Sequence, residues 1–171
     1  MSIKNRTGKQ KVYAFIDSQN LNLGIRDLGW KLDFARFKVY LKDKYRVDKA
    51  FLFIGFIKEN QKLYDFLRKA GYELIYKPTL ISKGKEIKGN VNAELVLHSM
   101  IEFSNYDKAV IVSGDGDFHC LVEYLLKKSK LLGVVIPNKY KFSALLREFD
   151  KYLDFLNLQK ANLSQKKRHN P

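Results

Sequence analysis

The sequence predicts a single α/β domain built on a mainly parallel sheet, and three observations support this fold class. Short runs of β-branched and aromatic residues alternate with longer stretches whose apolar residues recur every three or four positions, which is the pattern of strands alternating with helices. The chain has 171 residues, 46% of them hydrophobic, which is enough for one core and short for two. No internal repeat or low-complexity block divides it.

Five short apolar runs predict the strands, because each is rich in β-branched or aromatic residues and is bounded by turn-forming or charged ones. Five strands make a sheet of modest size. The predicted strands are Val12–Asp17, Ala50–Phe56, Tyr72–Tyr76, Lys108–Ser113 and Leu131–Ile136.

Five amphipathic stretches predict the helices that connect and follow these strands. In the second of them Leu63, Phe66 and Leu67 fall on one face of a helix with 3.6 residues per turn. The predicted helices are Leu32–Lys44, Glu59–Ala70, Val91–Phe103, Phe118–Lys128 and Phe142–Glu148.

Three basic segments stand outside this pattern. Residues 1–11 are polar and lack the apolar core of a signal peptide, so we expect a flexible N-terminus before a domain spanning residues 12–158. Residues 159–171 carry four basic residues and no acidic one, which favours a disordered tail because little apolar surface is available for burial. Residues 77–90 carry four lysines and one glutamate, and we expect this long loop to protrude.

Composition narrows the function further. The chain has 32 Lys and Arg residues against 18 Asp and Glu, a formal net charge of +14, which favours a polyanionic partner over a small neutral metabolite. Cys120 is the only cysteine, so an intrachain disulfide and a Cys-rich zinc site are excluded. No apolar run approaches the roughly 20 residues of a membrane span. We therefore expect a cytoplasmic protein with no membrane partner, and the sequence leaves homo-oligomerisation open.

Acidic side chains follow two of the predicted strands. Asp17 comes directly at the end of the first apolar run, and Asp115 and Asp117 come just after the fourth. Ligands of open parallel sheets collect at the carboxyl ends of the strands, so these three carboxylates converge if strands one and four are neighbours, as in a flavodoxin-like order. Three close carboxylates require a cation to neutralise them. Oxygen ligands without His or Cys favour Mg²⁺ or Mn²⁺, and such ions support phosphodiester hydrolysis.

A structural explanation of the same residues competes with this one. Asp-Gly is a common turn dipeptide, and Asp117 stands where an N-cap of the following helix would lie. An EF-hand calcium loop is disfavoured, because the required glycine at loop position six and glutamate at position twelve are missing.

The start of the predicted helix Val91–Phe103 carries further polar residues. Asn90 or Asn92 suits its N-cap. Glu94 and His98 are four residues apart and share a face, but a lone histidine at helical spacing is more often structural than catalytic.

Three segments together resemble the NYN domains of the PIN-like nuclease superfamily, in particular the bacterial LabA-like branch. They are residues 15–21 (FIDSQNL), 88–92 (KGNVN) and 112–118 (VSGDGDF). Their order along residues 12 to about 136 matches the order of the family motifs. The resemblance implies a PIN-like three-layer fold, with helices on both faces of a central, mainly parallel five-stranded sheet. It also implies a Mg²⁺- or Mn²⁺-dependent ribonuclease that acts on RNA.

The resemblance assigns roles to particular residues. It implies that Asp17, Asp115 and Asp117 ligate the metal and form the catalytic site together with Asn92. The family usually carries an aspartate at position 92, and the neutral asparagine implies weaker metal binding unless Glu94 compensates as a further ligand.

Further residues are expected to contact RNA. Asn20 would orient a ligand or the scissile phosphate, and the loop lysines Lys83, Lys85 and Lys88 would bind the RNA backbone. Tyr76 and Tyr140 are aromatic residues able to stack on bases, but the sequence does not give their exposure.

Two functions from different classes remain open. The chain is a metal-dependent ribonuclease, or it is an RNA-binding module of the same fold with little or no catalysis. A phosphatase-like enzyme with Asp17 as nucleophile is disfavoured, because Gln19 stands where a second aspartate would be needed.

Overall fold

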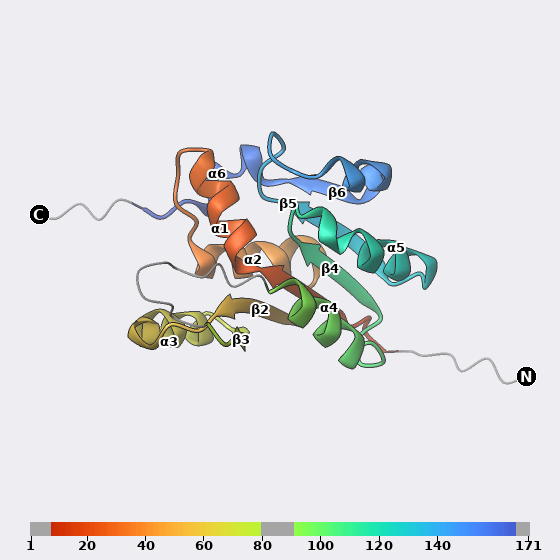
Figure 1. The fold of residues 1–171 in the computed structure, drawn as a ribbon, viewed down its shortest axis with the longest axis horizontal. Coiled ribbons are helices and arrows are strands. Elements are labelled where there is room, and N and C mark those ends of the chain that lie inside the picture. The colour runs from red at the N-terminus through yellow and green to blue at the C-terminus, as the bar shows by residue number, and fades with distance from the viewer. Residues whose placement is uncertain (1–7, 80–90, 167–171) are drawn as a thin grey trace, which may run out of the picture.

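The computed structural model describes residues 8–79 and 91–166. Their centre is one sheet in which every strand pairs in parallel with its neighbours, in the order β3-β2-β1-β4-β5-β6 (Figure 1). The strands are β1 (Val12–Asp17), β2 (Lys49–Gly55), β3 (Tyr72–Lys77), β4 (Lys108–Val112), β5 (Leu131–Ile136) and β6 (Leu153–Phe155). The predicted α/β class is thus confirmed, with six strands in place of five.

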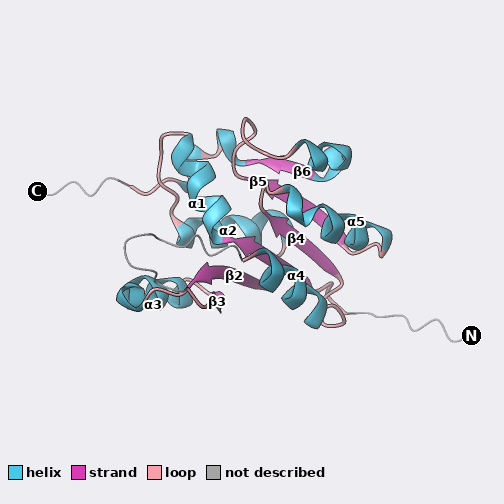
Figure 2. Ribbon diagram, viewed as in Figure 1, coloured by secondary structure: helices cyan, strands magenta, loops and turns pink. Residues whose placement is uncertain are grey.

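Helices cover both faces of this sheet (Figure 2). The α-helices are α1 (Ser18–Asp27), α2 (Phe34–Tyr45), α3 (Gln61–Lys69), α4 (Asn92–Ile101), α5 (His119–Lys127) and α6 (Lys160–Leu163). Four 3-10 segments complete the described part of the chain, η1 (Lys58–Asn60), η2 (Gly116–Phe118), η3 (Ala144–Tyr152) and η4 (Leu156–Leu158). No helix in the described ranges has the length and apolar character needed to cross a bilayer.

The two-residue period of β1 divides the core into two layers. Ala14 and Ile16 pack with α1 and α2 on one face, and Tyr13 and Phe15 pack with α4 and α5 on the other. Because side chains alternate along a strand, Asp17 falls on the face of Tyr13 and Phe15. The strand therefore delivers this carboxylate towards the start of α4.

Several elements differ from the sequence-based expectations. Helix α1 was not expected, and its residues include Asn20, Asn22 and Gly24, which are poor helix formers. Strand β6 is only three residues long, and its central Asp154 is accommodated because Tyr40, Lys44 and Tyr45 all donate hydrogen bonds to it. The predicted helix Phe142–Glu148 is instead the 3-10 segment η3, which begins after the capping residue Ser143.

The predicted disordered tail is wrong for residues 159–166, which fold against α2. Leu163 is 1% exposed in the core, and its carbonyl accepts a hydrogen bond from the backbone N–H of Asp33 at 2.8 Å. The guanidinium of Arg36 donates to the carbonyls of Asn162 and Ser164 at 3.4 Å each. One apolar anchor and several backbone hydrogen bonds therefore order this segment. Residues 167–171 lie outside the described part of the chain.

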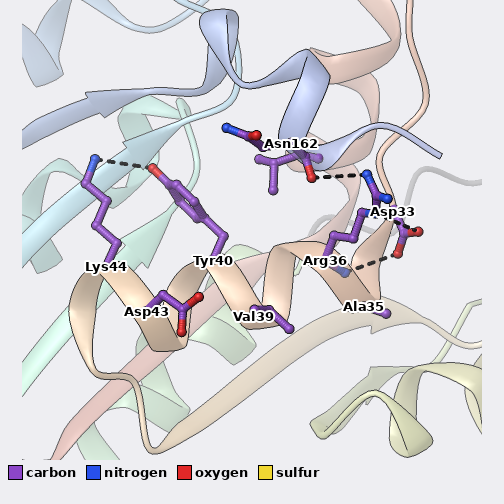
Figure 3. A pocket seen from close by; sticks show the side chains of 9 residues that line it. Asp33, Ala35, Arg36, Val39, Tyr40, Asp43, Lys44 and Asn162 are labelled. Atoms are coloured by element: carbon purple, nitrogen blue, oxygen red, sulfur yellow. Dashed lines mark hydrogen bonds and ion pairs between the residues drawn. The ribbon is translucent and has the colours of Figure 1, made fainter. Parts of the chain in front are cut away.

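A pocket of about 660 Å³ lies between α2 and α6, beside these contacts (Figure 3). It is lined by Asp33, Ala35, Arg36, Val39, Tyr40, Asp43, Lys44, Asn162 and Leu163. This set includes none of the acidic residues that follow β1 and β4.

At the other end of the chain, residues 1–7 of the predicted flexible segment lie outside the described ranges. Lys9 forms an ion pair with Asp48 at 3.0 Å, and the backbone N–H of Lys11 donates to Asp107 at 2.8 Å. These contacts fix the chain where it enters β1.

Candidate functional site

The strand order brings the predicted acidic residues together. β1 and β4 are hydrogen-bonded neighbours, with Ile16 opposite Val112, so the residues after both strands emerge at the same edge of the sheet. The connections after β1 run towards β3, and those after β4 run towards β6. This reversal is the position at which open parallel sheets bind ligands. The predicted flavodoxin-like order is wrong, and that order, 2-1-3-4-5, would separate strands one and four. The observed order is the doubly wound 3-2-1-4-5-6, which supplies the adjacency that the acidic site requires.

Asp17 is buried at this edge, with 5% of its surface exposed. Its Oδ1 accepts a hydrogen bond from the backbone N–H of Asn20 at 3.1 Å and so caps α1. Its Oδ2 accepts one from the hydroxyl of Ser113 at 3.2 Å. Burial raises the pKa of Asp17 above its ordinary value, and the negative charge of Asp115 acts in the same direction, against the hydrogen bonds that lower it.

The acidic loop, residues 113–117, is held by the side chains around it. Ser113 Oγ accepts from the backbone N–H of Asp115 at 3.1 Å, and Asn20 Oδ1 accepts from that of Gly114 at 2.8 Å. The Oδ1 of Asp115 accepts from the backbone N–H of Asp117 at 2.9 Å. Asp115 is thus the N-cap of η2. The N-cap of α5 is Phe118, and not Asp117 as the sequence suggested. The expected ligand-orienting residue Asn20 acts here by fixing the loop backbone.

Capping occupies one oxygen of Asp17 and one of Asp115, so it does not exclude these carboxylates as metal ligands. The Oδ2 atoms of Asp115 and Asp117 both accept hydrogen bonds from the side-chain amide of Asn92, at 3.2 and 2.9 Å. Asn92 is the first residue of α4, whose N-cap is Val91. Its side chain therefore bridges the two carboxylates, whereas the alternative cap Asn90 lies outside the described residues.

Glu94 and His98, on the same helix, have surroundings of their own. The Oε2 of Glu94 lies 3.8 Å from the Nζ of Lys77, at the end of β3. The ring of His98 packs against Phe51 and Phe53, with centroids 4.8 and 5.8 Å apart. This contact between α4 and the sheet agrees with a structural role for the histidine.

The donor chemistry of these residues fits a hard divalent cation. Among the described residues, no three Asp, Glu, His or Cys side chains are grouped so that they could hold one ion. Two carboxylate oxygens, of Asp115 and Asp117, nevertheless converge on one position, which the NH₂ group of Asn92 fills. Rotation of that amide would present its oxygen in place of its nitrogen, giving an oxygen-only set of the kind that Mg²⁺ and Mn²⁺ bind. Asp17 adjoins this set through Ser113.

A close approach at Gly116 also positions the acidic loop. A Cβ atom built there would overlap Ser143 Oγ and lie 2.9 Å from Ser143 Cβ. We expect Gly116→Ala to lower the free energy of unfolding by about 1–3 kcal/mol, since the packed neighbours must shift. Urea denaturation measures the change. Gly8→Ala is the matched control, because nothing lies within 4 Å of its Cβ position. Equal stability of the two variants would contradict the tight packing at Gly116.

The predicted RNA-binding lysines Lys83, Lys85 and Lys88 lie in residues 80–90, outside the described part of the chain. The two aromatic candidates differ in exposure. Tyr76 is half-buried, with its ring against Phe56 and Tyr64, whereas Tyr140 is exposed. The sequence could not distinguish these two positions.

The fold and the site together define a doubly wound α/β domain with an acidic centre at its topological switch point. The chain belongs to the NYN domain family, whose model matches residues 11–158. This is a nuclease-like family, and PIN-like nucleases generally use divalent metal ions.

Two individual proteins are also similar to this chain. The low amplitude and bright protein LabA of Synechococcus elongatus is 26% identical over 160 residues, which cover 87% of this chain and 86% of that protein. A crystal structure of a Vibrio parahaemolyticus protein of unknown function superposes with a TM-score of 0.72 at 22% identity. It covers 91% of this chain and 96% of its own, and it shows the shared fold.

Proposed function

We propose that the protein is a divalent-metal-dependent ribonuclease that hydrolyses RNA phosphodiester bonds at this acidic centre. The observation that carries the proposal is the continuous set of hydrogen bonds from Asp17 through Ser113 to Asp115, and through Asn92 to Asp117. Neighbouring strand ends and the start of α4 thus join these residues in one hydrogen-bonded network. Capping of α1 needs only a neutral acceptor such as Asn or Ser, so it does not explain why Asp17 is a carboxylate buried against its electrostatic cost.

Each residue has a part in this proposal. Asp115 and Asp117 would bind Mg²⁺ or Mn²⁺, with Asn92 as a neutral third ligand. Asp17 would support these ligands through its hydrogen bond with Ser113. The bound ion would supply an activated water and neutralise charge on the phosphoryl group. Asn20 keeps the acidic loop in place through its bond to Gly114.

Glu94 is proposed as an additional ligand. Its Oε2 is buried and accepts no hydrogen bond among the described residues; the nearest cation, the Nζ of Lys77, lies 3.8 Å away, which is too long for a hydrogen bond. Its recruitment requires the ion pair with Lys77 to open. The net charge of +14 favours RNA binding, and Lys83, Lys85 and Lys88 remain the proposed contacts to the RNA backbone.

The second candidate is an RNA-binding module with little catalysis, and the neutral Asn92 favours it. An amide removes one negative charge from the centre and satisfies Asp115 and Asp117 by hydrogen bonding. Because of both effects, a cation binds these carboxylate oxygens less tightly and displaces the amide less readily. The two candidates share the RNA-binding surface and differ in hydrolysis.

Incubation of the protein with end-labelled RNA tests the proposal. We expect cleavage products with Mn²⁺ or Mg²⁺ and none with excess chelator, since in the proposed reaction the bound ion activates the water and neutralises charge on the phosphoryl group. Restoring Mn²⁺ to the chelated sample should restore cleavage. Cleavage that persists in chelator would contradict the proposed metal dependence. Intact RNA at every Mn²⁺ concentration, together with measurable RNA binding, would favour the binding module.

A further inference from the structure

The loop that joins β5 to η3, residues 137–143, lies directly beside the acidic loop. β5 is the neighbour of β4, so both loops leave the same edge of the sheet. The backbone N–H of Ser143 donates to the carbonyl of Gly114 at 2.9 Å. A Cβ built on Gly114 would lie 3.0 Å from Phe142 Cβ. The β5–η3 loop is therefore a wall of the candidate site.

Two asparagines, one of them buried, hold the backbone of this loop in a fixed shape. Asn138 is 4% exposed; its Oδ1 accepts from the backbone N–H of Tyr140 at 2.9 Å, and its amide donates to the carbonyl of Gly24 at 3.3 Å. Asn157 Oδ1 accepts from the backbone N–H of Lys139 at 2.9 Å. These bonds tie the loop to α1 and to η4, without any contribution from the side chain of Tyr140.

The side chain of Tyr140 projects from this fixed backbone into solvent. It is 75% exposed, more than any other aromatic side chain in the described residues. The Nζ of Lys139 lies 5.1 Å from the centroid of its ring. Lys141, which follows Tyr140 in the chain, forms an ion pair with Asp27, with 3.0 Å between Nζ and Oδ2. A large aromatic ring is thus presented on a preorganised, locally basic loop, although the loop does not need that ring for its own packing.

We infer that Tyr140 is a stacking platform for an unpaired base of single-stranded RNA, with Lys139 beside it to meet a phosphate. The inference rests on the proposed function, and it names the substrate class of that same site as single-stranded. Stacking on an exposed aromatic face requires a base that is free on at least one side, as in single strands and unlike the interior of a duplex. The adjoining acidic loop would then face the backbone of a neighbouring nucleotide.

Binding in the presence of chelator tests the inference without cleavage of the probe. The probe is a fluorescein-labelled single-stranded RNA of about ten nucleotides, within the range of site sizes of single-strand binding domains. We expect Tyr140→Ala to weaken its binding about tenfold, the size of one lost base–aromatic stack, as measured by fluorescence anisotropy. Tyr140→Phe should bind like the wild type, because stacking needs the ring and not the hydroxyl.

Two controls separate stacking from charge and from general damage. An abasic oligonucleotide of equal length should bind equally to the wild type and to Tyr140→Ala, since it offers phosphates but no bases. Tyr124→Ala should leave RNA binding unchanged. Tyr124 also has a lysine over its ring, Lys128 at 5.6 Å, but its ring lies against Phe103, which follows the end of α4 opposite to Asn92.

The possible results distinguish this inference from the nuclease proposal. Equal RNA binding by the wild type and Tyr140→Ala would overturn the inference, even if Mn²⁺-dependent cleavage is observed. Equal losses with RNA and with the abasic probe would also overturn it, because charge or loop damage would then explain the change. Weakened RNA binding alone, in a protein that never cleaves RNA, would support the stacking platform and contradict the nuclease.

Discussion

Replacing Asp17 with asparagine is expected to reduce RNA cleavage strongly and to make the folded protein more stable at neutral pH. The loss of activity should be about 100-fold, the upper end of the range for residues that support the ligands of a metal site. The gain in stability follows from burial. A carboxylate with 5% exposure is charged in a poorly solvated place, and Asn keeps an oxygen that can accept the N–H of Asn20.

The pH dependence of this gain has a definite sign. Because burial, with the charge of Asp115, raises the pKa of Asp17 in the folded state, the native protein holds this proton more tightly than the unfolded chain. The contribution to stability is therefore complete below the ordinary aspartate pKa and is lost as the pH rises through the raised value. Thermal unfolding at neutral pH should show Asp17→Asn above the wild type, and the difference should shrink in acid.

Asp48→Asn is the matched control for this variant. Asp48 lies just before β2, and its pKa is lowered: burial alone would raise it, but the hydrogen bond from Val12 N–H and the ion pair with Lys9 outweigh this. Its charge therefore stabilises the fold above the ordinary pKa. We expect Asp48→Asn to lower stability at neutral pH and to leave cleavage unchanged. A decrease in stability for Asp17→Asn as well would mean that the buried carboxylate is well compensated.

Replacing Asn92 with aspartate is expected to raise Mn²⁺-dependent cleavage by about tenfold or more. The change adds a negative charge where Asp115 and Asp117 already converge. The added carboxylate would attract a bound cation, and unit charges about 4 Å apart attract by roughly 4 kcal/mol at an effective dielectric constant of 20. Part of this attraction is lost to desolvation of the charged groups. Initial rates with labelled RNA, measured across a range of Mn²⁺ concentrations, separate tighter metal binding from a faster hydrolytic step.

A stability measurement checks the same variant independently of activity. Without metal, Asn92→Asp places a third carboxylate beside two others and removes the bridging amide, so the Tm should fall below that of the wild type. Mn²⁺ should then raise its Tm by more than it raises the wild-type Tm, since a ligand that binds the folded state stabilises it. Asn105→Asp makes the same charge change at an amide that donates to Glu102, and it should alter neither rate nor metal response. Equal Mn²⁺ responses of the Asn92 and Asn105 variants would contradict a metal site at position 92.

The fold class could be predicted from the sequence because its signals are local. Five of the strands follow from apolar runs bounded by polar residues, and four of the expected helices overlap α2, α3, α4 and α5. The missed elements depend on contacts between distant parts of the chain. Helix α1 has weak helical propensity but packs closely, with the Cβ position of Gly24 2.8 Å from Pro137 Cβ. Segment α6 is ordered by Leu163 and Arg36, and neither contact can be read from composition.

The sequence by itself determined the α/β class, the basic character of the protein and the identity of the acidic residues after the first and fourth strands. These properties are local, since each depends on residue type and on position relative to an apolar run. The tertiary structure decided which of these residues meet. Strand order placed β1 beside β4, and the alternation of side chains turned Asp17 towards α4. Helix α4 brought the amide of Asn92 onto Asp115 and Asp117 and directed Glu94 to Lys77. Only folding made Tyr140 exposed and Tyr76 half-buried, because exposure depends on what the rest of the chain packs against each ring.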